Sequence, residues 1–566
     1  MQQLIECVPN FSEGNDLNKI DSIVNKIKSV EDIKILDVDP GKDTNRTVVT
    51  FVGEPNAVLD AAFEGIKEAS KIIDMSNHKG THPRIGATDV CPLIPIKNVT
   101  IEDCVKFSIE LAERVGRELN IPVYLYERSA KISDRENLAV IREGEYEGLE
   151  KKIKIRSWRP DYGPALFNAF SGATVIGCRE FLIAYNINLN TKDKRLATDI
   201  AFEIREQGRS KRIKNPQSSN LLDGEIVRNQ DGSPVKVPGL FKDIKAIGWY
   251  VSVYNRAQIS INFINYKVSS IHDVFDAVCK LAEERGIRVT GSELVGLVPK
   301  DALLLAGKHY LIKQNRTLGV IDRDIIECAI QSLGLNDVSQ FNPSEKIIEY
   351  AIESNDGLMD LSSRDLISLI SNSSPAPGGG SVAALAGALG AALLSMVGSL
   401  THEKKEYLSS REKMNEIGIS AQALISRLTY LVEEDTKAFN EIMKANRLPN
   451  GTAEQKRYKE RKIAHANNYA IEIPLQTAKL SLKVIELSIE LVKHGNPNSV
   501  TDSGVAAEVG LAGVRGACMN VLINISGSKN TEYKNLEKEI DSIIEKACTL
   551  HKKAFNYTKK MINKKK

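Results

Sequence analysis

The chain has 566 residues, of which 42% are hydrophobic and 26% are charged, and this composition is typical of a soluble globular protein of about two to four domains. Its formal net charge of +3 gives no general case for nucleic-acid binding. The eight cysteines include no Cys-x-x-Cys pair, which favours a reducing cytosol over a disulfide framework. Because the first residues lack a basic segment followed by an apolar run, we expect no signal peptide and a cytoplasmic protein.

The beginning of the chain alternates strand and helix patterns in the order β-α-β-β-α-β, which is typical of a ferredoxin-like unit. Strands are predicted at residues 4–8, 33–39, 46–52 and 89–94, and helices at 15–27 and 58–73. A further helix at 101–119 and a strand at 123–126 extend the unit. Because Pro92 lies inside the fourth strand, that strand is expected at a sheet edge.

The loop at residues 78–88 contains the strongest candidates for catalytic residues. His78 and His82 lie four residues apart, but Gly80 and Pro83 argue against the helix that a His-x-x-x-His metal site needs. A histidine held at the sheet and titrating near neutrality suits general acid–base catalysis, although a loop histidine that bonds the backbone is the alternative. Asp39 closes the second strand and either orients the imidazole or forms the turn, and spacing alone does not choose.

Residues 161–172 interrupt the pattern with a loop bounded by glycine and proline. Its aromatic residues Phe167 and Phe170 could pack onto a flat ring system or form a hydrophobic plug between subdomains. The same order of elements then returns, with strands predicted at 181–189, 244–254, 258–266 and 287–298 and helices at 191–207 and 271–285. Two α/β units of one topology predict a groove between them that binds a ligand.

The second half of the chain is predicted to be helical. Residues 332–363 are polar and are interpreted as a linker with one helical stretch, at 344–353. A Pro-Gly-Gly-Gly-Ser loop at 377–381 leads into an apolar run, 382–400, that is about long enough to cross a bilayer. Its many small residues, with no second span expected after it, favour instead a soluble helical bundle, and the N–H groups that open this helix favour an anion such as a carboxylate.

A long helix is predicted at residues 414–443, and Asp435 lies on its apolar stripe. Burial there should raise the pKa of Asp435 and make its carboxyl useful as an acid near neutral pH. The alternative is an aspartate satisfied by a basic or amide partner across the bundle, while Glu433 and Glu434 are expected to be solvated. A polar loop at 494–502 then precedes a helix with one thin face of small residues.

The motifs at residues 6–14, 37–41, 45–46, 79–87 and 293–299 resemble the glutamate formimidoyltransferase domain, over about the first 330 residues. The resemblance implies that His82 is the catalytic acid–base, that Asp39 is its partner, and that a glycine-bounded loop lines the folate site. That loop consists of Gly163, Pro164, Ala165, Leu166, Phe167, Asn168, Ala169, Phe170, Ser171 and Gly172. Arg46 and Arg84 are candidates, by position, for holding the carboxylates of the glutamate and of the folate tail.

Residues 377–381, 434–439, 443–449 and 494–524 resemble the formimidoyltetrahydrofolate cyclodeaminase domain, whose helical fold is shared by the methenyltetrahydrofolate cyclohydrolases. This resemblance implies that Asp435 is the catalytic acid–base of the second half. The expected fold class is therefore α/β followed by all-α, with two ferredoxin-like α/β subdomains that form a folate groove and then a helical-bundle domain. The expected boundaries are 1–178 and 179–330 for the two subdomains, 331–359 for the linker and 360–566 for the helical domain.

Together the two resemblances imply a bifunctional enzyme of histidine degradation. The first domain would transfer the formimidoyl group from N-formimidoyl-L-glutamate to tetrahydrofolate, with polyglutamylated folate as the expected co-substrate. The second would cyclise 5-formimidoyltetrahydrofolate to 5,10-methenyltetrahydrofolate and release ammonia. We expect no metal, a homo-oligomer, and neither a nucleic-acid nor a membrane partner. The alternatives are a cyclohydrolase activity in the helical domain and a non-catalytic folate-binding scaffold.

Overall fold

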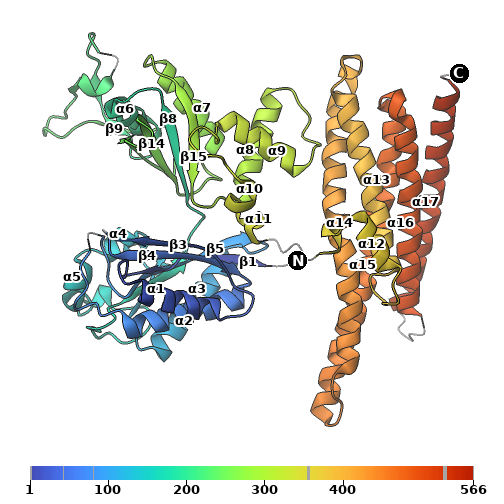
Figure 1. The fold of residues 1–566 in the computed structure, drawn as a ribbon, viewed down its shortest axis with the longest axis horizontal. Helices are drawn as coiled ribbons and strands as arrows, with labels where there is room; N and C mark the ends of the chain where they lie inside the picture. Colours follow the sequence, from blue (N-terminus) through green and yellow to red (C-terminus); the bar gives the residue numbers. More distant parts are fainter. Residues whose placement is uncertain are drawn as a thin grey trace. The chain divides into compact units, whose positions relative to one another are not determined.

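The computed structural model describes residues 3–42, 44–80, 82–218, 220–352, 357–526 and 532–564. The chain divides into two compact units, one of Met1–Ala302 with Leu333–Glu353 and one of Leu303–Ser332 with Ser354–Lys566. In the part of the chain that is described, the strands all lie in the first unit and the second unit is helical (Figure 1). The predicted fold class, α/β followed by all-α, is confirmed.

The first half of the first unit is built on a ferredoxin-like sheet in the order β3-β4-β1-β5. Its strands are β1 (Leu4–Cys7), β3 (Lys34–Gly41), β4 (Arg46–Gly53) and β5 (Thr88–Lys97), and β2 (Asn10–Phe11) continues the line of β1. Two parallel strands, β7 (Thr174–Cys178) and β6 (Val123–Glu127), extend the sheet beyond β5. Helices α1 (Leu17–Lys28), α2 (Pro55–Ile72) and α3 (Ile101–Glu118) cover one face, where the apolar core lies (Figure 1).

The prediction that Pro92 places its strand at a sheet edge is wrong, because β5 pairs with β1 and β2 on one side and with β7 on the other. Pro92 lies opposite Val8, where the neighbouring strand is interrupted between β1 and β2. Val8 N donates to Pro92 O at 3.2 Å, and Val8 O accepts from the side-chain amide of Asn10 at 2.7 Å. The interruption therefore accommodates a strand interior that lacks one N–H donor.

The opposite face of this sheet is covered in part by the segment between β6 and β7. It contains α4 (Leu138–Ile141) and α5 (Glu145–Lys152), which no pattern predicted. A second apolar cluster, which includes Tyr124, Tyr126 and Leu149, forms beneath them. The rest of that face carries the polar side chains of the first candidate site.

The predicted repeat of the unit is present as a second, four-stranded antiparallel sheet in the order β13-β14-β8-β15. Its elements are β8 (Ile183–Leu189), α6 (Lys194–Ile204), β13 (Ile244–Val251), β14 (Arg256–Phe263), α7 (Ile271–Glu283) and β15 (Val289–Val295). Four two-residue strands fill the excursion between α6 and β13: β9 (Arg209–Ser210), β10 (Arg212–Ile213), β11 (Glu225–Ile226) and β12 (Lys236–Val237). Alternate residues such as Ile187 and Ile259 are buried with α6 and α7, so Asn186 and Gln258 lie on the other face.

The segment interpreted as a linker is partly ordered within the first unit. It contains α10 (Pro343–Lys346) and α11 (Ile348–Ile352), whose ends bond the main chain of Val298 at 2.9 Å and 3.1 Å. Asp337 accepts a hydrogen bond from Asn188 at 2.9 Å, which attaches the segment to the second sheet. Residues 353–356, also inside this interpretation, lie outside the described residues.

The second unit is a bundle of long helices. Its elements are α12 (Ser363–Ile370), α13 (Gly379–His402), α14 (Arg411–Arg447), α15 (Ala453–His494), α16 (Val500–Ile525) and α17 (Glu532–Asn563), with most of α8 (Lys300–Lys313) and α9 (Asp322–Leu333). Gly319 is one position where close packing requires glycine, because a Cβ there would lie 2.4 Å from the Cα of Gly418. The loop that follows α8 thus packs directly on the backbone of α14.

Two helices of this bundle, Gly379–His402 and Pro497–Ile525, are long and apolar enough to cross a membrane by length and composition. The expectation that no second such run follows the first is therefore wrong. Their most apolar stretches are 61% and 50% buried inside the structure, and core helices of soluble bundles have the same properties.

Candidate functional sites

His82 lies on the open face of the first sheet with both ring nitrogens engaged. Its Nδ1 lies 2.7 Å from the carbonyl oxygen of Pro83, and its Nε2 lies 2.9 Å from Nη1 of Arg46. Since a guanidinium can only donate, Nε2 must accept and the ring proton belongs on Nδ1. Burial lowers the pKa of His82, and the charges of Arg46 and Arg142 lower it further, so the ring is held neutral.

A buried ion pair next to this histidine was not predicted from the sequence. Arg142 bonds the carboxylate of Asp89, which is buried at the start of β5 and also accepts from Ile85 N at 3.0 Å. The charges of both Arg142 and Asp89 act on the pKa values of His82 and of Arg46. Arg142 and Asp89 are 53 residues apart, and no motif or spacing links them.

Asp39, the predicted partner of His82, is exposed on β3 opposite Val48. Among the described residues it makes no hydrogen bond to His82; its charge acts instead on the pKa of Arg46, which burial lowers and which Asp89 and Asp39 raise. The role of Asp39 stays a prediction, and in this structure its charge acts on Arg46, which contacts the imidazole. Arg46, which was predicted only as a carboxylate ligand, is the residue that contacts the ring.

The predicted folate loop, Gly163–Gly172, lies beside the His82 loop. Ser171 O accepts from Ala87 N at 2.8 Å, Phe170 O accepts from Met75 N at 2.9 Å, and Gly86 forms a bridge with Gly172. Its two aromatic residues take different roles, because Phe167 packs on Tyr146 in the core while Phe170 is exposed. The interpretation as a hydrophobic plug therefore fits Phe167. Of the two residues, only Phe170 is exposed and could pack onto the ring system of a ligand.

Several polar atoms around this site are buried without a hydrogen-bond partner in the part of the chain that is described. They are Asn10 Oδ1, Arg46 Nε, Thr88 Oγ1 and Ser171 Oγ. Strand pairing of β2 with β4 and β5 brings the segments of the first three together, and Ser171 bonds the residue before Thr88. Buried polar groups are normally paired, so these atoms indicate a site built for a polar ligand.

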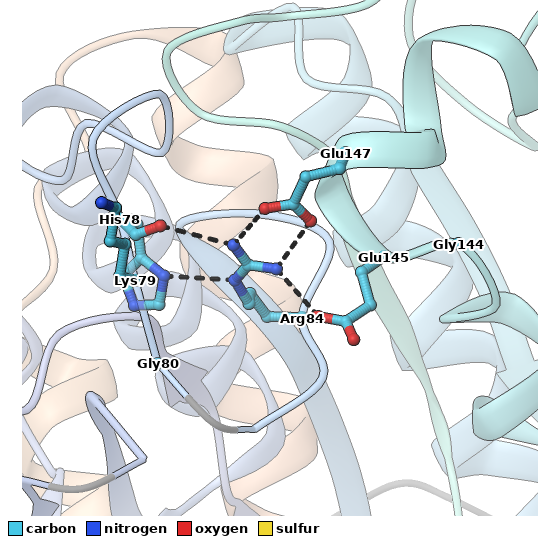
Figure 2. Close-up of a pocket in the computed structure, with 7 residues that line it drawn as sticks. All are labelled: His78, Lys79, Gly80, Arg84, Gly144, Glu145 and Glu147. Carbon is cyan, nitrogen blue, oxygen red and sulfur yellow. Dashed lines mark hydrogen bonds and ion pairs between the residues drawn. The ribbon is translucent and has the colours of Figure 1, made fainter.

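The second predicted arginine, Arg84, is already neutralised. Its guanidinium bonds Glu147 at 2.6 Å and Glu145 at 2.8 Å, and its Nε bonds His78 Nδ1 at 3.2 Å (Figure 2). These residues, with Lys79, Gly80 and Gly144, line a pocket of about 500 Å³. Because two carboxylates already hold Arg84, the structure does not leave it available to a substrate carboxylate as Arg46 is.

Asp435 lies where α14 meets the start of α13. Its carboxylate covers Gly380, where a Cβ would come within 2.0 Å of Oδ1, and Oδ2 accepts from Ser381 Oγ at 3.2 Å. Burial raises the pKa of Asp435, and the hydrogen bonds from Ser381 lower it by less. Within the described ranges no basic or amide side chain bonds Asp435, so the alternative of such a partner is not supported. The prediction of a raised pKa is confirmed.

The expectation that Glu434 is solvated is wrong, since it is only 6% exposed. Tyr469 on α15 donates to its carboxylate, Lys437 lies 3.0 Å away, and these bonds lower the pKa of Glu434 against the effect of burial. Helix α14 is covered on two sides, by α13 at Asp435 and by α15 at Glu434, whereas the expectation assumed one buried stripe.

Three family models match successive parts of the chain. They are the formiminotransferase domain, N-terminal subdomain, at residues 4–179, the formiminotransferase domain at 184–353, and formiminotransferase-cyclodeaminase at 362–556. A formimidoyltransferase-cyclodeaminase of Dictyostelium discoideum is 40% identical over 554 residues, which are 97% of this chain and 97% of that protein. This chain belongs to the formimidoyltransferase-cyclodeaminase family.

Two shorter proteins are also similar to this member of the formimidoyltransferase-cyclodeaminase family. A glutamate formimidoyltransferase of Thermoplasma acidophilum is 41% identical over 310 residues, 54% of this chain and 92% of that protein. A methenyltetrahydrofolate cyclohydrolase of Methylorubrum extorquens is 33% identical over 195 residues, 34% of this chain and 94% of that protein. His82 lies inside the first family match and Asp435 inside the third, so each candidate site lies in a different matched region.

Proposed function

We propose that this chain catalyses two consecutive steps on tetrahydrofolate. In the first, N5 of tetrahydrofolate attacks the formimidoyl carbon of N-formimidoyl-L-glutamate, and the bond from that carbon to the glutamate nitrogen then breaks. In the second, N10 attacks the same carbon of 5-formimidoyltetrahydrofolate, ammonia leaves, and 5,10-methenyltetrahydrofolate forms. The single observation that carries the proposal is the family match over 97% of the chain. The neutral His82 in one unit and the half-buried Asp435 in the other support it.

His82 suits the proton transfers of the first step. With its proton on Nδ1, the ring offers Nε2 as the base that takes a proton from N5 and returns one to the departing glutamate nitrogen. In this structure Arg46 occupies that lone pair. A substrate carboxylate is a stronger acceptor than an imidazole, so its binding would draw Arg46 away and free Nε2 for catalysis.

Asp435 suits the second step. Its ionised carboxylate can take the proton from N10, and because burial raises its pKa the protonated form can then pass a proton to the leaving nitrogen. Ser381 orients the Asp435 carboxylate through its hydroxyl and its backbone N–H, and these bonds lower the pKa by less than burial raises it.

One coupled assay tests both steps. N-formimidoyl-L-glutamate and tetrahydrofolate are supplied, and glutamate, ammonia and methenyltetrahydrofolate are followed together. His82→Ala should reduce glutamate release about 10²–10⁴-fold while ammonia release from added 5-formimidoyltetrahydrofolate persists. Asp435→Asn should do the reverse, with 5-formimidoyltetrahydrofolate accumulating. Loss of both activities in either variant would contradict two separate sites.

The similarity to a methenyltetrahydrofolate cyclohydrolase favours a second candidate for the helical unit. Such an activity would add water to methenyltetrahydrofolate rather than release ammonia. Ammonia formed in proportion to methenyltetrahydrofolate supports the cyclodeaminase, whereas consumption of added methenyltetrahydrofolate without ammonia supports the hydrolase.

We also propose that the chain forms a homo-oligomer through α13 and α16. These helices expose apolar side chains, several of them seven residues apart: Val382, Leu389, Met396, Val505 and Met519. The exposed side chains of Glu508 and Arg515 also lie on α16, and such charges do not suit a lipid face. Leu389→Glu with Met519→Glu should reduce the mass measured by light scattering; an unchanged mass with loss of vesicle binding would instead support a membrane face.

The co-substrate in this proposal carries a polyglutamate tail, neither step uses a metal, and the protein is cytoplasmic. Its free cysteines fit a reducing compartment. We expect the affinity for tetrahydrofolate to rise with the number of glutamates in its tail. We also expect both activities to survive treatment with a metal chelator.

A further inference from the structure

The face of the second sheet opposite α6 and α7 carries a carboxylate that neutral donors hold in place. Glu293 of β15 lies opposite Asn186 of β8, and Asn186 Nδ2 donates to its Oε1 at 2.8 Å. Gln258 of β14 donates to the same oxygen at 3.3 Å, and Tyr254 donates through its hydroxyl to Oε2 at 3.2 Å. Two amides and a phenol therefore fix the orientation of this carboxylate without neutralising it.

The charge on Glu293 is uncompensated in the described part of the chain, where no lysine or arginine forms an ion pair with it. Its negative charge raises the pKa of the Tyr254 hydroxyl. A carboxylate has about four lone-pair positions, and the three donors leave capacity on the group. Such a carboxylate is prepared for further N–H donors from a ligand.

Gln258 supplies a second acceptor at the same place. It is 0% exposed, and its Oε1 has no hydrogen-bond partner among the described residues. The orientation of the amide is determined, because its Nε2 must face Asn188 Oδ1 at 2.6 Å and Glu293 Oε1, both of which only accept. A buried, unpaired carbonyl costs free energy that a donor from a ligand would recover.

The surface beside these acceptors can receive a flat group. Trp249 of β13 lies opposite Gln258 in the strand register and is partly exposed on the same face of the sheet. An aromatic face next to a carboxylate and an amide oxygen matches a planar ligand that carries N–H donors along one edge.

We propose that Glu293 and Gln258 bind the N–C–N edge of an amidine-like group. Two adjacent N–H donors on such an edge match the two acceptors of one carboxylate, as a guanidinium does. The proposal rests on the proposed function, whose substrates offer this chemistry twice: in the 2-amino-4-oxopyrimidine edge of the pterin and in the formimidoyl group itself.

A neighbouring carboxylate provides a matched control. Asp337 lies on the same network but accepts from Arg256 at 2.8 Å, from Asn188 at 2.9 Å and from Thr290 at 3.0 Å. Its charge is compensated by Arg256, so its role is to attach residues 333–352 to the sheet. Asp337→Asn should lower the melting temperature without a selective effect on ligand affinity.

The test measures binding directly on the full chain, in wild type, Glu293→Gln and Asp337→Asn. The probes are 5-formyltetrahydrofolate, its analogue with methyl in place of the 2-amino group, and N-formimidoyl-L-glutamate. If the pterin edge binds here, Glu293→Gln weakens 5-formyltetrahydrofolate about tenfold or more, and the methyl analogue binds both proteins equally. If the formimidoyl group binds here, the loss appears for N-formimidoyl-L-glutamate.

Tyr254→Phe guards against a folding defect, because it removes only one donor to Glu293 and should give a smaller loss for the same probe. The proposal is overturned if Glu293→Gln binds every probe within twofold of wild type, or if Asp337→Asn gives the same selective loss. Since the readout is affinity, wild-type protein that binds the probes but transfers no formimidoyl group would count against the proposed function alone.

Discussion

Arg46 determines both the protonation and the accessibility of His82. Its guanidinium donates to the nitrogen that must act as the base, and its charge, after burial, lowers the pKa of that histidine. Arg46→Gln should therefore raise the pKa of His82, so that the acidic limb of the kcat/KM profile for transfer moves to higher pH. A base works only when unprotonated, which fixes the direction of this shift.

The control for this experiment is Arg84→Gln. Arg84 bonds His78 and two glutamates, and it does not contact His82. This variant should lose thermal stability because Glu145 and Glu147 lose their partner, but the acidic limb should stay in place. An acidic limb that moves equally in both variants would mean that the profile reports a group other than His82.

Glu6 is a second titrating residue, buried in β1 with 2% of its surface exposed. Burial raises the pKa of Glu6 from 4.5 to about 7, and the charge of Arg179 opposes this by less. The folded pKa lies above the unfolded one, so the stabilising contribution of the protonated carboxyl is complete below pH 4.5 and is lost as the pH rises through 7.

Glu6→Gln keeps the shape and removes this titration. The variant should unfold with a free energy about 3 kcal/mol higher than wild type at pH 8, and the difference should vanish towards pH 4. Calorimetry of the first unfolding transition at both pH values measures the effect. A variant less stable than wild type at pH 8 would show that the ionised carboxylate is needed in the fold.

At the scale of elements, the start of α13 positions Asp435 through a single missing side chain. A Cβ on Gly380 would lie 2.0 Å from Asp435 Oδ1, whereas a Cβ on Gly379 would meet only Asn520 Nδ2, at 3.6 Å. Gly380→Ala should therefore displace the carboxylate and reduce ammonia release about 10²-fold or more, since a displacement of about 1 Å has such an effect. Gly379→Ala adds the same methyl group to the same turn and should retain most activity.

Both variants are compared for ammonia release, glutamate release and melting temperature. Glutamate release should be unchanged in each, because the transferase residues lie in the other unit. Equal losses of ammonia release in the two variants would mean that the helix start tolerates no side chain for reasons of packing, and that Asp435 is not the group affected.

Helices and strands whose apolar residues recur with a regular period could be predicted from the sequence. Features that depend on which distant segment packs against an element could not. The ferredoxin-like order of β1, α1, β3, β4, α2 and β5 follows from alternation and helical spacing in each segment. The interior position of β5 does not, because Val175 of β7 pairs with Val90 of β5 from a distant part of the chain and turns a predicted edge into an interior strand. The same limit explains Glu434, whose burial depends on α15.

The candidate sites divide in the same way. His82 and Asp435 could be predicted because local residues and motifs mark them. The ion pair of Arg142 with Asp89 and the contact of Arg46 with His82 depend on segments far apart in the chain. Charges that act across a sheet leave no periodic signal, so the residues that tune the pKa of His82 are visible only in three dimensions.

At the scale of the whole molecule, the chain passes between its two units three times. Residues 303–332 belong to the helical unit, although they precede residues 333–352 of the α/β unit. Their attachment is specific: Asn415 on α14 accepts from Leu318 N at 2.7 Å, and Ser395 and Ser399 on α13 both donate to Gly319 O at 3.0 Å. A cut in the predicted linker therefore leaves residues 303–332 on the N-terminal fragment, although they pack on helices of the C-terminal fragment.

We expect that full-length protein cleaved at a protease site inserted after residue 355 keeps its two fragments together. Residues 317–319 stay with the first fragment and pack on α13 and α14 of the second, so both fragments should elute as one species and retain both activities. Gly319→Val places side-chain atoms where a Cβ alone would lie 2.4 Å from Gly418, and should let the cleaved fragments separate. Wild-type fragments that part on a sizing column without denaturant would contradict this attachment, and fragments of the valine variant that stay together would place the main contact elsewhere in residues 303–332.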